Sequence, residues 1–119
     1  MPLGSATTTA SLPLDDVLDC LSNERRRLTI EIIHDTDGPL SLSEVAERVA
    51  ARQYGVERAA LTSDQRKCVY TGLYQAHMSK LTEVDAVAFD DREKTISPAE
   101  NTPALARTIS RLRSQFDAG

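Results

Sequence analysis

Apolar residues in the first two thirds of the chain recur at three- and four-residue spacings, the pattern of helices with one buried face. The first stripe consists of Leu14, Val17, Leu18 and Leu21, and further stripes follow at residues 24–37, 42–54 and 63–83. Helix-capping and helix-ending residues separate the stripes: Ser22-Asn23, Gly38-Pro39, Gly55 and Thr62. The pattern therefore predicts four helices, of which the last is the longest.

Two short motifs predict where the third and fourth helices begin. Ser41 precedes Glu44 by three residues, and Thr62 precedes Gln65 by the same distance. Each pair has the form of a capping box, in which the two side chains satisfy each other's free backbone amides. Leu40, just before the first box, is expected in a very short strand.

After residue 83 the pattern changes to a weak alternation that is typical of strands. Residues 84–89 and 95–96 are the predicted strands, and residues 90–93 (Asp-Asp-Arg-Glu) have the composition of a hairpin turn. Thr102 and Pro103 then start a final helix as its N-cap and first helical residue. A plain helical bundle would leave the hairpin unexplained.

The expected fold class is therefore mainly α with a small β-hairpin, arranged as a winged helix-turn-helix with an additional C-terminal helix. We expect residues 1–12 to form a disordered tail and residues 13–100 to form a winged-helix DNA-binding domain. Residues 101–119 would form the C-terminal helix, as a dimerisation element.

Composition limits the functions that this fold could serve. The 119 residues include 14 basic and 18 acidic ones, giving a formal net charge of −4 and a pI of about 5.1. This balance excludes a generally basic nucleic-acid coat but allows a DNA reader with a local basic face. Three Tyr, two Phe and no Trp argue against a base-stacking platform for single strands.

The sequence carries no signature of catalysis or metal binding. It has no Gly-rich phosphate loop, nucleophile elbow or HExxH motif. Cys20 and Cys68 lie far apart without a CxxC motif, so they do not form a zinc site. We expect no enzyme, no metal and no cofactor, and two reduced cysteines on half-buried helix faces of a cytoplasmic protein. Stretches free of charged residues are too short for a membrane span.

Residues 69–90, VYTGLYQAHMSKLTEVDAVAFD, resemble the recognition helix and wing entry of the ArsR-type winged-helix repressors. The run LYQAHMSKL at residues 73–81 is similar to the Leu-x-x-x-His-Leu-Pro-Lys-Leu run of a haloarchaeal winged helix-turn-helix domain family. The resemblance covers about residues 14–100 and implies a winged-helix fold in a DNA-binding regulator. Ser79 occupies a position at which that family often has Pro. Asp85-Ala86 occupies two positions at which it often has Ala-Gly. The paired cysteines of ArsR-type metal sensors are absent.

A helical projection at about 100° per residue divides residues 68–81 into two faces. The bulky face, which we expect to pack inward, holds Tyr70, Leu73, Tyr74, His77, Met78 and Leu81. The small polar face holds Cys68, Thr71, Gln75 and Ser79, with Gly72 and Ala76 beside them. Gln75 could pair bidentately with adenine, and Thr71 or Ser79 could reach a base or a phosphate. The alternative is an ordinary solvated face.

Basic residues near this helix and at the hairpin turn are candidate phosphate contacts. They are Arg66, Lys67, Lys80, Arg92 and Lys94. The Arg25-Arg26-Arg27 cluster could either touch phosphate or pair with Glu24 and Glu31. We expect His77 to be a packed, hydrogen-bonded histidine at the junction of helix and wing rather than a ligand.

The final helix suggests an assembly. Its apolar residues have the 4, 3, 4 spacing of a coiled-coil seam, and they are Leu105, Ile109, Leu112 and Phe116. A symmetric homodimer on this seam would place two recognition helices about one DNA turn apart. Alternatively, or in addition, the seam packs on the first helix of its own chain.

The leading hypothesis is a sequence-specific, double-stranded DNA-binding transcription regulator that acts as a dimer. The recognition helix would enter the major groove and the wing would lie on the adjacent backbone. The second hypothesis is a winged-helix module that binds protein rather than DNA, which the acidic net charge makes plausible.

Overall fold

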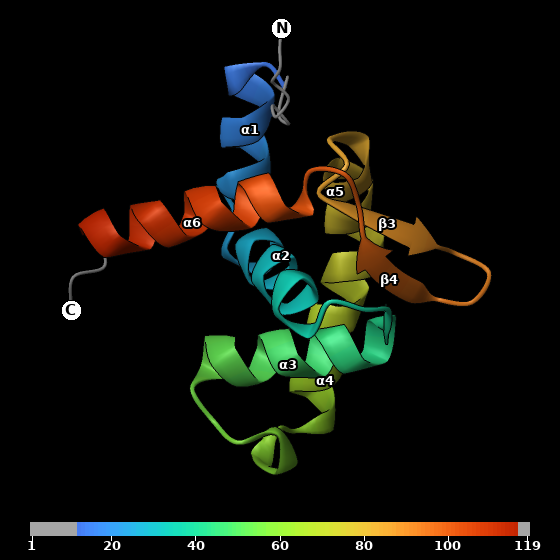
Figure 1. Cartoon of the computed structure of the whole chain (residues 1–119). Helices are drawn as coiled ribbons and strands as arrows, with labels where there is room; N and C mark the ends of the chain where they lie inside the picture. The colour runs from blue at the N-terminus through green and yellow to red at the C-terminus, as the bar shows by residue number, and fades with distance from the viewer. Residues whose placement is uncertain (1–11, 117–119) are drawn as a thin grey trace, which may run out of the picture.

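The computed structural model describes residues 12–116, so the tail expected at residues 1–12 lies almost wholly outside the described residues. The elements follow one another in the order α1 (Leu14–Leu21), α2 (Glu24–Thr36), β2 (Leu40–Ser41), α3 (Leu42–Tyr54), η1 (Arg58–Ala60), α4 (Ser63–Gly72), η2 (Leu73–His77), α5 (Met78–Glu83), β3 (Val87–Asp90), β4 (Thr95–Pro98) and α6 (Thr102–Phe116). The chain is therefore mainly helical with a small antiparallel sheet, as its pattern predicts (Figure 1).

The predicted caps define most helix ends. The Asn23 side chain accepts hydrogen bonds from the first turn of α2, and Gly55 ends α3 in the left-handed conformation. Thr62 and Gln65 form the complete capping box at the start of α4, with both hydrogen bonds 3.0 Å long. These local signals fixed the helix boundaries because each satisfies backbone groups that the helix leaves free.

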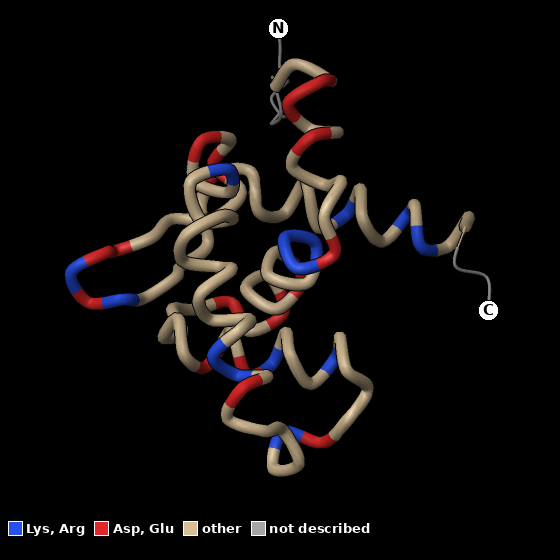
Figure 2. The backbone as a smooth tube through the Cα atoms, turned by 180° about the vertical axis from the view of Figure 1, so that it is seen from behind, with Lys and Arg blue, Asp and Glu red and all other residues tan. Residues whose placement is uncertain are grey.

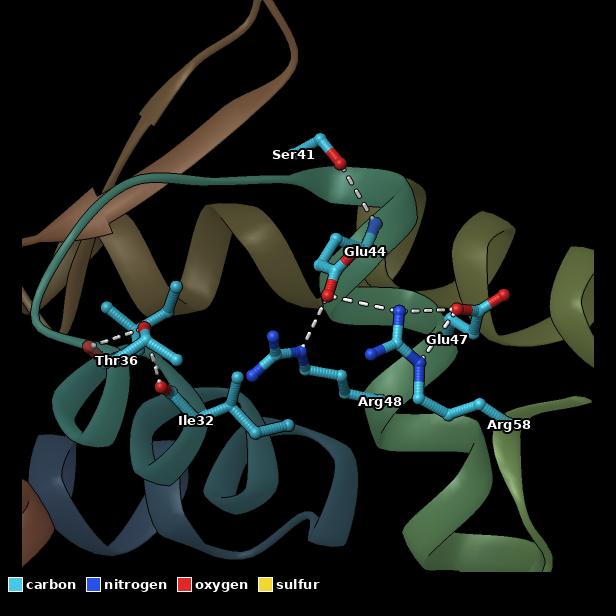
Figure 3. Close-up of polar contacts among 8 residues, drawn as sticks. Ile32, Thr36, Ser41, Glu44, Glu47, Arg48 and Arg58 are labelled. Carbon is cyan, nitrogen blue, oxygen red and sulfur yellow. Dashed lines mark hydrogen bonds and ion pairs between the residues drawn. The ribbon is translucent and has the colours of Figure 1, made fainter.

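The capping box expected at α3 forms only in part. The Ser41 hydroxyl accepts the backbone N–H of Glu44 at 3.0 Å. The Glu44 carboxylate turns instead to the guanidinium groups of Arg48, at 2.8 Å, and Arg58, at 3.0 Å (Figure 3). Two cations compete here with a single backbone amide for the carboxylate, and charge-assisted bonds are the stronger ones.

The long helix expected over residues 62–83 contains one irregular turn. The α-helical hydrogen bonding of α4 gives way to a single π-helical turn, η2, before α5 continues to Glu83. The wider turn shifts the angular position of every side chain beyond it, compared with a regular α-helix. A projection at a constant angle per residue therefore loses accuracy at Tyr74 and Gln75.

The sheet has three strands in the order β2-β4-β3, all antiparallel. Leu40 pairs with Ile96, so the very short strand expected there joins the hairpin to the helical body. The Asp90 carboxylate accepts the backbone N–H groups of Arg92 and Glu93, each at 3.0 Å, and so shapes the hairpin turn.

The connection from α5 to β3 forms without a glycine. Asp85 adopts a left-handed conformation with φ 56°, and Ala86 donates its backbone N–H to Leu81 at 2.9 Å, as in a Schellman motif. Asn101 holds this turn from the start of α6, through its side-chain bond to the Val84 carbonyl at 2.9 Å. The strand therefore starts at Val87 and not at Val84.

α2 forms the centre of the molecule, between α3 on one side and α6 on the other (Figure 1). Its fully buried side chains meet the apolar faces of the other elements. The largest fully buried side chains of the whole core are Ile30, Ile32, Ile33, Leu42, Leu73, Leu81, Ile96 and Ile109. The core is thus one apolar layer shared by all the long helices and by β4.

α6 belongs to this same core, which corrects the expected dimer seam at Leu105 and Ile109: as in the alternative, they pack within their own chain, although α6 lies mainly on α2 and not on the first helix. Leu105 and Ile109 are only 2% and 1% exposed, because they pack within the chain, where α6 contacts α2. Leu112 and Phe116, further along α6, are 41% and 76% exposed. Only the second half of the predicted seam is therefore accessible to a partner.

We predict that Ile109→Ala lowers the free energy of unfolding by about 2–5 kcal/mol, the usual effect of truncating a buried branched side chain. Ser110→Ala, at the next position and exposed, should change it by no more than about 0.5 kcal/mol. Urea unfolding followed by circular dichroism measures both. Equal effects of the two substitutions would contradict the packing of α6 on the core.

Candidate nucleic-acid interface

The outer side of α4, η2 and α5 lies beside the β3–β4 hairpin. Figure 2, which shows the molecule from behind, shows that acidic and basic positions alternate around the hairpin turn. Val69, Leu73, Met78 and Leu81 are buried on the inner side. The exposed residues of the outer side are Lys67, Cys68, Gln75, Ala76, Ser79 and Lys80, while Thr71 is half-buried. The structure therefore brings together most of the polar face that the projection predicts.

Tyr74 departs from the expected inward face. Its ring is 37% exposed and turns toward the hairpin, where it meets Phe89 edge-on with ring centroids 6.1 Å apart. Its hydroxyl donates a hydrogen bond to the Asp91 carboxylate at 2.8 Å. Tyr74 therefore connects the long helix to the turn of the hairpin, a role that its spacing in the sequence does not indicate.

Lys94 folds back onto this same contact. Its ammonium lies 5.0 Å from the centre of the Tyr74 ring and 2.8 Å from the Asp91 carboxylate. The hydrogen bonds from Lys94 and Tyr74 lower the pKa of Asp91, and the bond to Asp91 raises the pKa of Lys94. Lys94, expected to contact phosphate, thus serves first to hold the hairpin turn on the helix.

Two more predicted phosphate contacts are also in ion pairs. Arg66 pairs with Glu47 at 3.0 Å, and Lys80 pairs with Asp19 of α1 at 2.8 Å. Lys67 and Arg92, by contrast, form no ion pair with any of residues 12–116. Of the five basic candidates, only these two present a cation without a carboxylate partner in the described part of the chain.

Glu47 places the start of α4 through two arginines. Its carboxylate binds Arg58 at 2.6 Å and Arg66 at 3.0 Å, and Arg66 also donates to the Arg58 carbonyl at 2.8 Å. Figure 3 shows the Arg58 side chain reaching from the η1 segment to the Glu44 and Glu47 carboxylates of α3. This network fixes η1, and with it the start of α4, on α3.

Arg25 covers the side of α4 that carries Gly72, which the projection places beside the small polar face. Its Nε donates to Gln53 at 2.8 Å, and its Nη2 lies 3.9 Å from the Cys68 sulfur. A Cβ atom at Gly72 would come within 2.8 Å of the Arg25 guanidinium. Gly72 therefore makes room for an arginine of the same chain.

Arg26 is buried, with 6% of its surface exposed, and its side chain contacts two other segments of the chain. It donates to the carbonyls of Asp19 and Cys20, each at 2.8 Å, at the end of α1. Its Nη1 lies 2.9 Å from Nδ1 of His77, the last residue of the π-helical turn. Neither role expected for the arginine cluster describes this residue, which joins α1, α2 and the long helix.

The other members of the cluster do not form the ion pairs that were one of the two expectations for them. Arg27 donates to the Leu21 carbonyl at 2.7 Å, and Glu31 pairs with Arg113 of α6. Neither Arg25 nor Arg27 forms an ion pair with Glu24 or Glu31 in the described chain.

His77 is half-buried and hydrogen-bonded as expected, but it faces α2 and not the hairpin. Because a guanidinium can only donate, Nδ1 of His77 must accept, which requires the neutral imidazole. Burial, and then the positive charges of Arg26 and Arg25, lower the pKa of His77 below 6.5. Protonation would break the contact that Arg26 makes with the π-helical turn.

The two cysteines are unequal, although both were expected to be half-buried. Cys20 is buried against the core, which raises the pKa of its thiol. Cys68 is exposed on the outer side of α4. Within residues 12–116 no three His, Cys, Asp or Glu side chains are grouped so that they could hold a metal ion. The same residues include no helix with the length and apolar character of a membrane span.

Residues 18–97, about two thirds of the chain, match the family model described as Domain of unknown function (DUF7344). The match spans the segment from α1 to β4 and thus includes the whole candidate interface. Among curated proteins and solved structures there is no significant match to the chain.

We predict that the stability of the protein depends on the protonation of His77. A lowered pKa means that the folded state binds the proton less well than the unfolded state, so the stabilisation is complete above about pH 6.5 and is lost as pH falls toward the folded-state pKa. His77→Gln keeps an acceptor without this titration and should flatten the decline. Unfolding free energies from urea titrations at a series of pH values measure it.

His34→Gln, at an exposed position of α2, provides the matched control for the loss of one imidazole. A proton NMR titration that gives His77 a pKa at or above 6.5 would contradict the contact with Arg26.

Proposed function

The chain belongs to the DUF7344 family, whose description assigns no function, and from the geometry above we propose that it is a sequence-specific, double-stranded DNA-binding transcription regulator. The proposal takes the fold as a winged helix-turn-helix. In this interpretation α2, α3 and the continuous α4–η2–α5 helix form the three-helix unit, and the β3–β4 hairpin is the wing.

The observation that carries the proposal is the division of the α4–η2–α5 helix into a buried side and an exposed side. Leu73 and Leu81 anchor one side in the core, while Gln75 stands exposed on the other, between Thr71 and Ser79. An amide at this place can pair with an adenine edge, and short hydroxyl side chains allow the helix to approach the major groove. Lys67 and Arg92, which form no ion pair within residues 12–116, add cations on the helix and on the wing.

The remaining basic residues support the proposal because they could exchange their carboxylate partners for phosphates. Arg66, Lys80 and Lys94 are paired with carboxylates, but the three basic side chains are 41–45% exposed. Exposed ion pairs contribute only about 0–1 kcal/mol, so a phosphate could replace the carboxylate at little cost. Backbone contacts of this kind supply affinity for any sequence.

A depression of about 440 Å³ between the starts of α3 and α4 adjoins this face. It is lined by Ser43, Ala46, Glu47, Ser63, Arg66, Lys67 and Tyr70. Free backbone amides at helix starts favour anions, and the two serine hydroxyls and Lys67 add donors. Glu47 reduces the positive charge but is neutralised by Arg58 and Arg66. This depression is the place where the proposed complex would hold a backbone phosphate.

The regulator would act as a homodimer through α6. Leu112 and Phe116 leave an apolar surface on the second half of that helix. A two-fold axis there would present two recognition helices to two half-sites of an operator.

One observation favours a second candidate, a winged-helix module that binds protein. The carboxylates of Glu47, Asp19 and Asp91 offset three of the five basic candidates, which leaves the face with little net positive charge. Binding to DNA requires a local excess of positive charge on the protein, whereas binding to another protein does not require one.

We predict that Gln75→Ala relaxes base preference. Loss of a bidentate amide–adenine pair should weaken binding to a preferred duplex, selected from a random library, by about 1–3 kcal/mol and leave random DNA unaffected. Fluorescence anisotropy with both duplexes measures this, and Gln115→Ala on α6 is the matched control. Equal losses on the two duplexes would contradict the orientation of the helix.

Lys67→Ala and Arg92→Ala should weaken binding to all duplexes alike. Each should also reduce the slope of log affinity against log salt by about 0.9, because one phosphate contact is lost. Arg107→Ala, at an exposed position of α6, should leave the slope unchanged. If the wild type binds no duplex even at low salt, the DNA proposal is wrong and the protein-binding module replaces it.

A further inference from the structure

The apolar stripe of α1 is largely uncovered. Leu14 and Leu18 are 69% and 54% exposed, and only Cys20 and Leu21 at the end of the helix are buried. A helix of eight residues is not stable in water by itself and depends on packing of its apolar face. The exposed half of this stripe therefore marks a contact that is not made within residues 12–116.

A groove at the second half of α6 adjoins this stripe. It has a volume of about 240 Å³ and is lined by Leu21, Arg27, Ile109, Leu112, Arg113 and Phe116. Leu21 belongs both to α1 and to the groove, so the two apolar surfaces are continuous. Figure 1 shows that the C-terminal half of α6 extends beyond the helical body.

The charges of the two surfaces are opposite. α1 carries Asp15, Asp16 and Asp19 and no basic residue, whereas α6 carries no acidic residue. Arg27 and Arg113 line the groove, although Arg113 also binds Glu31. Asp15 and Asp16 form no ion pair with other described residues. An acidic, leucine-bearing helix therefore complements the groove both in apolar surface and in charge.

We propose that the occupant of the groove is α1 of a second copy of this chain. Leu14 and Leu18 of each copy would pack against Leu112 and Phe116 of the other, with the acidic residues of α1 near the arginines of the groove. Because each copy carries both the stripe and the groove, a two-fold axis makes the same contact twice and closes the assembly. This rests on the proposed homodimer, and it assigns α6 a partner other than a second α6.

Sedimentation equilibrium of the full chain without DNA tests the assembly. Leu18→Glu and Leu112→Glu each bring a carboxylate into the contact and should raise the dimer dissociation constant more than tenfold. Ala59→Glu, on the exposed η1 segment, makes a similar change elsewhere and should leave the constant unchanged. Far-UV circular dichroism confirms that the variants fold. A wild-type chain that is monomeric at every concentration would overturn the proposal.

Disulfide trapping identifies the pairing of the helices. In a Cys20→Ala, Cys68→Ser background, Leu18→Cys and Leu112→Cys are oxidised alone and as an equal mixture. The proposal expects a cross-linked dimer only in the mixture, joining one variant to the other. Efficient cross-linking of Leu112→Cys alone would show α6 against α6, and no cross-link in the mixture would equally overturn the exchange. Because neither measurement involves DNA, failure here is separable from failure of DNA binding.

Discussion

The buried guanidinium of Arg26 is the interaction on which the arrangement of the helices most depends. Four of its hydrogen bonds reach Asp19, Cys20, Ser22 and His77, so it fastens the end of α1 and the π-helical turn to α2. No carboxylate pairs with it among the described residues, so backbone carbonyls and a neutral imidazole must offset the cost of burying its charge. Loss of one of these acceptors would destabilise the arrangement, and so would a positive charge on His77 beside the charge of Arg26.

Two different contacts hold the outer side of α4, η2 and α5 in place. Arg26 fixes the inner side of the π-helical turn, and Tyr74 on the same turn holds the hairpin through Phe89 and Asp91. The turn thus links the orientation of Gln75 to the position of the hairpin. For a DNA reader, this would keep the base-contacting side chain and the wing in one fixed relation, which lowers the entropic cost of binding.

The sequence alone indicated the helices, the hairpin and most helix ends, because caps such as Asn23 and Thr62 act within a few residues. It also placed Gln75 on the exposed side of the long helix. It failed where side chains far apart in the chain meet. Arg26 shares the i, i+4, i+7 spacing of Ile30 and Ile33, a signal of burial that its charge obscured. No pattern indicates the π-helical turn, the arginine over Gly72 or the choice of α2 as the helix on which Leu105 and Ile109 pack, because these depend on the partner and not on the residue.

The most direct test of the proposed DNA-binding face is a titration of the 15N-labelled chain with a short duplex, followed by amide NMR. The account predicts chemical-shift changes concentrated in residues 63–79 of the long helix and 90–94 of the hairpin, with the amides of α6 little affected. Changes confined to α1 and α6, or none at low salt, would contradict it.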